Sequence, residues 1–329
     1  MGKDQCTTFE TLDFHLRAFA ILLTPRSTAI TSALHSRTPA LNARCTVCHA
    51  PLAALPAARL MPAAHADESV SCETCHGAAS AWLRSHTRRD YTYQQRIASG
   101  MTDLRSLYGR ANTCVACHEV LPPDIAKAGH PDLIFELDSQ TVSEPPHWHD
   151  PDPWIGLHSW LTGQAVAFRE ETWHMLRDAP GASSRWEALG WLLQQATADL
   201  KDLPRFSIPQ GAITAADLAA LETTSDRLAK SAPAFPWTAA TAQHLLRSLA
   251  SRSPGIRQSD GIERQSRRAE VLVQAMDRLL VALNHQGVSI PGASQGLDLL
   301  FADLRLADAF NSARFCQHLD QFSNSVGKL

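Results

Sequence analysis

The chain has 329 residues, a formal net charge of −3, 44% hydrophobic residues and 19% charged residues. This composition is typical of a globular protein and excludes a disordered one, and the length is sufficient for two domains. No block of basic residues suggests a nucleic-acid partner, and no apolar run reaches the ~18 residues that a membrane span needs. The most apolar short stretch, residues 14–23, is interrupted by His15 and Arg17.

Two helices are predicted at the start of the chain. Leu12, Leu16, Phe19 and Leu23 form an apolar stripe that predicts a helix over residues 7–24, which Pro25 ends. His15 lies on the same face of this helix. A second helix is predicted over residues 28–36, and it contains His35.

Between residues 45 and 118 one five-residue pattern occurs three times. Cys-x-x-Cys-His is found at residues 45–49, 72–76 and 114–118. From the frequencies of Cys and His, one such pattern is expected by chance on the order of 0.01 times in this chain. The pattern is the attachment signature of c-type haem, in which two thiols form thioethers with the porphyrin and the histidine binds the iron.

The repeats therefore predict three covalently bound haem c groups. The predicted thioether residues are Cys45, Cys48, Cys72, Cys75, Cys114 and Cys117, and the predicted proximal iron ligands are His49, His76 and His118.

Two other interpretations of the repeats explain the sequence less well. Cys-x-x-Cys also occurs in structural zinc sites, but zinc does not require a histidine directly after the second cysteine each time. A disulfide within a motif would close a very short loop and would leave the histidine unexplained. Cys6 and Cys316 lie outside the motifs. Three interpretations of these two cysteines remain open: free thiols, a disulfide or, for Cys6, the relic of another haem site.

Other histidines are candidates for the distal side of each iron. His86 follows His76 by ten residues and lies with Trp82 on a helix predicted over residues 78–86. His130 lies in a turn in which Gly129 permits a close approach and Pro131 fixes the exit. The main candidates are His15, His86 and His130, with His65 and His35 as further candidates; His147 and His149 are interpreted as linker residues.

The chain changes character at a Pro-rich linker over residues 147–153. Residues 1–146 are predicted to form a haem-binding domain with little regular structure, because porphyrins rather than side chains would fill its core. Residues 154–329 are predicted to form an up-down helical bundle that acts as a scaffold or docking domain. One predicted helix follows Trp154, and another begins at a capping box at Thr214. The other predicted helices span residues 186–200, 236–252, 263–284 and parts of 296–322. The predicted fold class is mainly α with essentially no β-sheet.

Several of these segments resemble multihaem c-type cytochromes of the cytochrome c-554 type. The similarity covers roughly residues 11–175. It rests on residues 13–19, 70–79 with Trp82, Leu83 and His86, 111–118, and 128–131 with 135–137. The resemblance implies that His15, His86 and His130 are distal-ligand positions.

The chain departs from this family at both ends. Relatives often begin with another haem site, where this chain has only Cys6, and they tend to carry a further motif where residues 186–193 contain no cysteine. The chain therefore resembles a reduced, three-haem member.

The favoured function is electron transfer through three haems, mostly with two histidine ligands, by a carrier rather than a catalyst. The expected partners are redox proteins or a larger multihaem complex. One alternative is an oxidoreductase acting on a small nitrogen or sulfur compound at a five-coordinate haem, for which the first haem has the least defined distal ligand. A second alternative is a subunit whose helical half docks to a larger multihaem complex.

The expected location is the periplasm or another exported compartment. Covalent haem attachment takes place outside the cytoplasm in bacteria, but residues 1–6 begin no apolar leader. We therefore expect a leader that has been removed or that lies outside this numbering.

Overall fold

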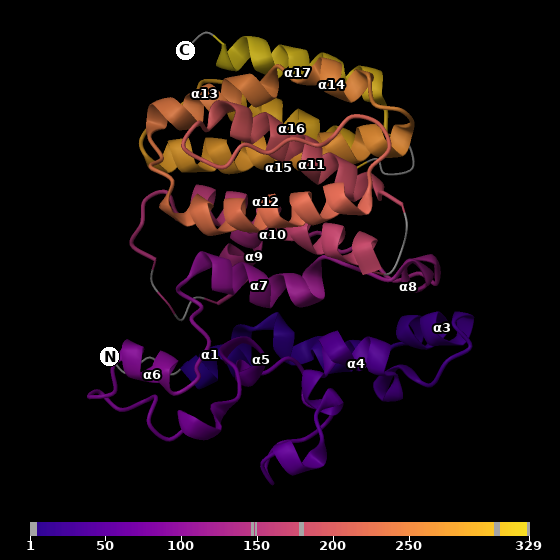
Figure 1. The fold of residues 1–329 in the computed structure, drawn as a ribbon, viewed down its shortest axis with the longest axis vertical. Coiled ribbons are helices and arrows are strands. Elements are labelled where there is room, and N and C mark those ends of the chain that lie inside the picture. The colour runs from indigo at the N-terminus through magenta and orange to yellow at the C-terminus, as the bar shows by residue number, and fades with distance from the viewer. Residues whose placement is uncertain (1–4, 146–147, 149, 178–180, 306–309, 328–329) are drawn as a thin grey trace. The chain divides into compact units, whose positions relative to one another are not determined.

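The structure, a computed structural model, describes residues 5–145, 148, 150–177, 181–305 and 310–327. The chain forms two compact units, Met1–Phe135 with Ser139–His149 and Glu136–Asp138 with Asp150–Leu329. The described residues contain helices and no strand (Figure 1), which confirms the mainly α fold class. No helix in these ranges has both the length and the apolar character needed to span a membrane.

The first unit is built from short helices joined by turns. Its helices are α1 (Gln5–Leu12), α2 (Ala18–Leu22), α3 (Pro25–Ala33), α4 (Ala43–His49), α5 (Cys72–His76), α6 (Tyr93–Ala98), α7 (Leu107–His118) and α8 (Pro123–Lys127). The 3₁₀ turns are η1 (Phe14–Arg17), η2 (Pro39–Leu41), η3 (Pro51–Ala54), η4 (Ala57–Arg59) and η5 (Ala79–Ala81). Helix α9 (Leu137–Ser143) runs from the second unit into the first.

The helix predicted over residues 7–24 is interrupted at Asp13. Asp13 has an extended backbone (φ −78°, ψ 125°), and its side chain accepts a hydrogen bond from the backbone N–H of His15. Short acidic side chains compete in this way with the helical hydrogen-bond ladder, so they favour caps over helix interiors. The break separates α1 from η1 and places His15 in a 3₁₀ turn.

The helix predicted over residues 78–86 was also wrong in extent. Only η5 forms there, and it is followed by successive turns in which Leu83 N–H donates to the Ala79 carbonyl and His86 N–H to the Trp82 carbonyl. The chain bends here while burying Trp82, which is 3% exposed. Gly77 ends α5 with a φ of +78°, a backbone conformation that favours glycine.

The second unit is arranged around α15 (Ile262–His285), which packs against α10, α11, α13, α14, α16 and α17. The other helices of this unit are α10 (Ile155–Arg177), α11 (Ser184–Asp199), α12 (Ala215–Ser231), α13 (Ala239–Ala250), α14 (Ser253–Arg257), α16 (Ala293–Leu304) and α17 (Ser312–Val326). The 3₁₀ turn η6 (Ala232–Ala234) follows α12. Helix α15 corresponds to the helix predicted over residues 263–284, and its apolar face is buried, with Leu272, Met276 and Leu279 fully enclosed. The capping box predicted at Thr214 and Asp217 opens α12.

Replacing Leu279 by alanine should destabilise the helical unit by about 3 kcal/mol, because a buried leucine is lost and a cavity remains. The matched control is Ile262→Ala on the same helix, where the side chain is 56% exposed and the expected change is below about 0.5 kcal/mol. Urea unfolding followed by circular dichroism measures both. Equal effects of the two substitutions would contradict the burial of this face of α15.

Candidate haem-binding centre

Each Cys-x-x-Cys-His motif lies at the C-terminal end of a helix. Helices α4, α5 and α7 end at His49, His76 and His118. Residues i and i+3 of a helix lie on the same face, so the two cysteines of each motif project on one side. Side chains cap two of these helices at their other ends, where Asn42 accepts from Arg44 N–H and Ser106 accepts from Gly109 N–H.

The cysteines of different motifs lie close to one another. A hydrogen bond between Cys48 and Cys117 raises the pKa of Cys48, to which burial adds, and lowers the pKa of Cys117. Burial, with a smaller contribution from nearby Cys114, raises the pKa of Cys75 to about 12. The third motif therefore has a cysteine next to the first motif and another near the second.

Two of the motif histidines each face a second histidine. The ring centroids of His49 and His130 lie 6.4 Å apart, and those of His118 and His15 lie 6.0 Å apart, with interplanar angles of 62° and 89°. A metal ion bound at about 2 Å by one nitrogen of each ring would hold the centroids roughly 6 Å apart. These two ring pairs therefore have the separation of two axial ligands on one iron.

Hydrogen bonds leave the Nε2 atoms of the first pair available. Nδ1 of His49 lies 3.0 Å from the Ala18 carbonyl, and Nδ1 of His130 lies 2.8 Å from the Pro131 carbonyl. A carbonyl only accepts, so each Nδ1 carries the proton and Nε2 is the nitrogen free to bind a metal.

The turn that carries His130 is fixed from two sides. Gly129 has a positive φ of +103°, a backbone conformation that favours glycine. Its carbonyl accepts two hydrogen bonds from the Arg26 guanidinium, at 3.2 and 2.9 Å. Arg44 of the first motif's helix forms a bidentate ion pair with Asp124 of α8, at 2.8 and 2.6 Å. These contacts tie the His130 turn to the segment that carries His49.

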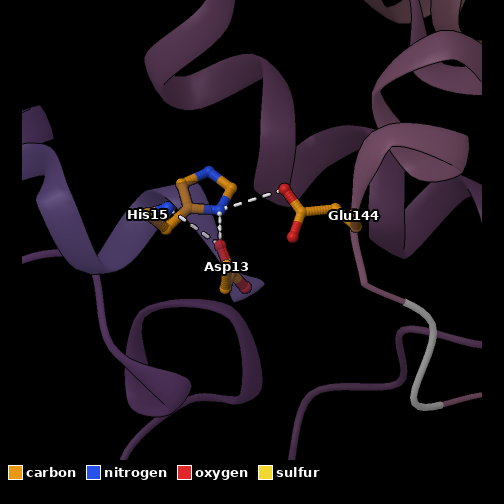
Figure 2. Close-up of side chains that lie close together, drawn as sticks. All are labelled: Asp13, His15 and Glu144. Carbon is orange, nitrogen blue, oxygen red and sulfur yellow. Dashed lines mark hydrogen bonds and ion pairs between the residues drawn. The ribbon is translucent and has the colours of Figure 1, made fainter. Parts of the chain in front are cut away.

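His15 is held by two carboxylates, as Figure 2 shows. Its Nδ1 lies 3.1 Å from Asp13 Oδ1 and 3.0 Å from Glu144 Oε1. The hydrogen bond with Glu144 raises the pKa of His15 in spite of its burial, and burial raises the pKa of Asp13. One ligand atom from each of the three residues lies within 4.8 Å of the others, a spacing that is also compatible with a metal ion.

The second motif has a different environment. The ring of His76 packs edge-on against Trp82, at 6.5 Å between centroids, and Trp82 packs in turn against His86 at 5.6 Å. Nδ1 of His86 lies 2.5 Å from the Leu83 carbonyl, so its Nε2 is again the available nitrogen. The structure thus brings His76 and His86 onto the same indole ring.

The remaining candidate ligands lie apart from these pairs. His35 and His65 are exposed, and within the described ranges neither makes a ring contact with a motif histidine. His35 has a left-handed backbone with φ +48°, and His65 donates its backbone N–H to Glu68. His147 and His149 lie outside the described residues.

Large apolar side chains are exposed mainly in the first unit. Phe14, Leu41 and Val142 are 71–73% exposed, whereas in the described part of the second unit the large exposed ones are Ile262 and Leu299. A porphyrin offers broad apolar faces, and burying apolar side chains against them is favourable. The paired cysteines, the available Nε2 atoms and these apolar side chains together fit haem.

A comparison with protein families found a match for the N-terminal part of the chain. Residues 3–77 match the family model described as cytochrome c554 and c-prime. This segment is cytochrome c554-like. The match confirms the resemblance to multihaem cytochromes of this type, and it indicates a c-type cytochrome, a class that carries covalently bound haem and works in electron transfer.

The matched segment includes the first two motifs and His15. The third motif at residues 114–118, His86 and His130 lie beyond it. Searches of curated proteins and of solved structures found no match.

If His49 and His130 hold one haem iron, replacing His130 by alanine should convert that haem from low-spin to high-spin, because the iron would lose one of its two imidazoles. His15→Ala should do the same for the haem bound by His118. Electron paramagnetic resonance of the oxidised protein measures the change. The control is His285→Ala, an exposed histidine at the end of α15. A fully low-spin spectrum in either ligand variant would rule out that pair.

Proposed function

We propose that the chain is a multihaem c-type cytochrome that transfers electrons through three covalently bound haems. The six motif cysteines would attach the porphyrins, and His49, His76 and His118 would be the proximal ligands. The observation that carries the proposal is the pairing of His49 with His130 and of His118 with His15, at centroid separations of 6.4 and 6.0 Å. His86 remains the candidate distal ligand for the second motif.

The protein residues would set the conditions for electron exchange. Haem iron supplies one-electron chemistry, and its axial ligands tune its potential over ~0.8 V. Two imidazoles on one iron leave no position open for a substrate, an arrangement that suits a carrier. Hydrogen bonds to Nδ1 fix the orientation of these imidazoles.

An order of the three sites forms part of the proposal. The contact between Cys48 and Cys117 and the proximity of Cys75 to Cys114 support a third site that lies between the other two. Electrons would then pass between the first and second sites by way of the third.

The proposed setting is outside the cytoplasm. Covalent haem attachment takes place there in bacteria, which supports a periplasmic or otherwise exported location. Redox proteins or a larger multihaem complex would be the partners. We propose residues 1–146 as the haem-binding domain, 147–153 as a linker and 154–329 as a scaffold or docking domain.

The purified, exported protein should carry three covalent haems. Pyridine haemochrome absorbance per chain, with the mass of the intact chain, measures this number. A variant with both Cys72 and Cys75 replaced by alanine should carry two haems, because its second motif has no thiols. The matched control replaces Cys6 and Cys316, which lie outside the motifs, and should keep three. A wild-type chain without covalent haem would contradict the proposed function.

The second motif supports a second candidate function, an oxidoreductase acting on a small nitrogen or sulfur compound. Trp82 is the ring packed against His76, and an indole nitrogen donates hydrogen bonds but does not bind a metal. A haem held by His76 with its other side open would be five-coordinate and could bind such a compound.

Carbon monoxide distinguishes the two functions. Reduced wild-type protein should not bind it if all three irons have two imidazole ligands, as the carrier function requires. The positive control is His130→Ala, which should gain one carbon-monoxide-binding haem. Binding at one haem of the wild type, abolished by Cys72→Ala with Cys75→Ala, would favour the oxidoreductase instead.

A further inference from the structure

The cluster of Asp13, His15 and Glu144 differs from the surroundings of the other candidate ligands. Nδ1 of His49, His86 and His130 contacts backbone carbonyls, which are neutral. Nδ1 of His15 contacts two carboxylates, while its Nε2 points away from them (Figure 2).

The two carboxylates come from separate parts of the first unit. Asp13 precedes η1, is 8% exposed at its side chain, and also accepts the backbone N–H of His15 at 2.8 Å. Glu144 directly follows α9, and its side chain is 30% exposed. Because Asp13 already holds the backbone of His15, Glu144 is the partner that acts on the ring alone.

Hydrogen bonding accounts for this arrangement without a metal ion. The separations of 3.0 and 3.1 Å are ordinary lengths for N–H···O bonds. A proton on Nδ1 satisfies a carboxylate and leaves Nε2 as the nitrogen available on the opposite edge of the ring. The 6.0 Å separation between the rings of His15 and His118 suits the same assignment.

We propose that Glu144, assisted by Asp13, is a positioning residue for the haem of the third motif. Glu144 accepts the Nδ1–H of His15, orients the ring toward the iron bound by His118, and strengthens Nε2 as a donor. A ligating histidine hydrogen-bonded to a carboxylate is a more basic ligand than one bonded to a neutral carbonyl. A more basic ligand favours ferric iron, so Glu144 lowers the midpoint potential of this haem. The inference rests on the proposed function, because it requires a haem at the third motif.

The test is a spectroelectrochemical titration of the haem-loaded Glu144→Gln variant. The midpoint potential of one haem should rise, while the haem count and the low-spin spectra stay unchanged. The affected haem is identified as the one that becomes high-spin in His15→Ala. Glu144→Asp keeps a carboxylate and should restore part of the shift.

A matched control separates the effect of a carboxylate on the His15 ring from the effect of net charge. Asp67→Asn removes one negative charge from an exposed position of the same unit and should leave the potential of the third haem nearly unchanged. Equal shifts in Glu144→Gln and Asp67→Asn, or a shift spread over all haems, would overturn the positioning role while leaving the proposed function intact. A wild-type chain without covalent haem would overturn both.

Discussion

The first unit is organised around two pairs of imidazole rings, His118 with His15 and His49 with His130, whose centroids lie 6.0 and 6.4 Å apart. The motif supplies one imidazole from the end of a short helix. The other imidazole of each pair comes from elsewhere in the chain. His15, the partner of His118, lies in η1, and His130, the partner of His49, lies in the turn after α8. The short helices and turns of this unit form a frame that holds the rings of each pair close together, at interplanar angles of 89° and 62°.

The partners of Nδ1 provide a second level of control. A histidine binds metal through one nitrogen, and whatever binds the other nitrogen sets the tautomer and the basicity of the ring. At His49 and His130 these partners are carbonyls, so the rings are oriented without added charge. At His15 they are carboxylates. If both ring pairs hold haem iron, the two sites therefore need not have the same potential, although their axial ligands would be the same.

The sequence predicted what is local and missed what depends on distant contacts. The motif histidines and the turn at Gly129 follow from adjacent residues, and the amphipathic stripe of α15 follows from helical periodicity. Asp13 breaks a helix that its apolar neighbours predicted, because a side-chain hydrogen bond outcompetes the backbone there. No spacing in the sequence connects Glu144 with His15. The same holds for the position of Trp82 between His76 and His86, since the helix predicted around it does not form.

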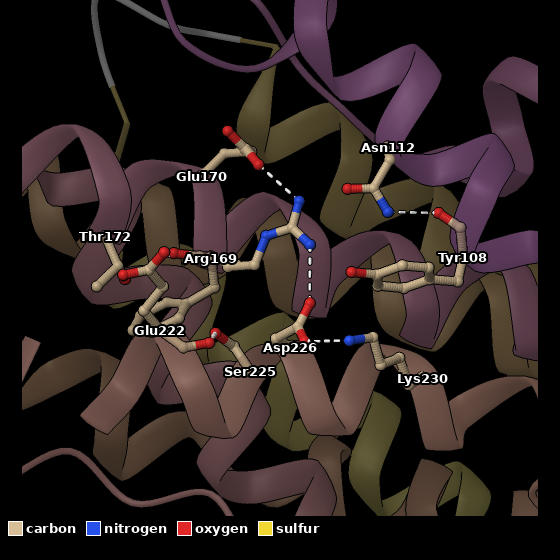
Figure 3. Close-up of polar contacts among 10 residues, drawn as sticks. Tyr108, Asn112, Arg169, Glu170, Thr172, Glu222, Ser225, Asp226 and Lys230 are labelled. Carbon is tan, nitrogen blue, oxygen red and sulfur yellow. Dashed lines mark hydrogen bonds and ion pairs between the residues drawn. The ribbon is translucent and has the colours of Figure 1, made fainter. Parts of the chain in front are cut away.

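The two units differ in what holds each of them together. The helical unit encloses its own apolar side chains around α15. Polar contacts add to this packing: Arg169 of α10 donates hydrogen bonds to Glu170 and to Asp226 of α12 (Figure 3). Asp226 also accepts a hydrogen bond from Lys230. The first unit instead exposes Phe14, Leu41 and Val142 and has few turns of helix to enclose them. Ligands that bind only the folded state stabilise it, and covalent haem would do so through both its iron and its apolar faces. The stability of the first unit should therefore depend on haem attachment, whereas the helical unit has a core that needs none.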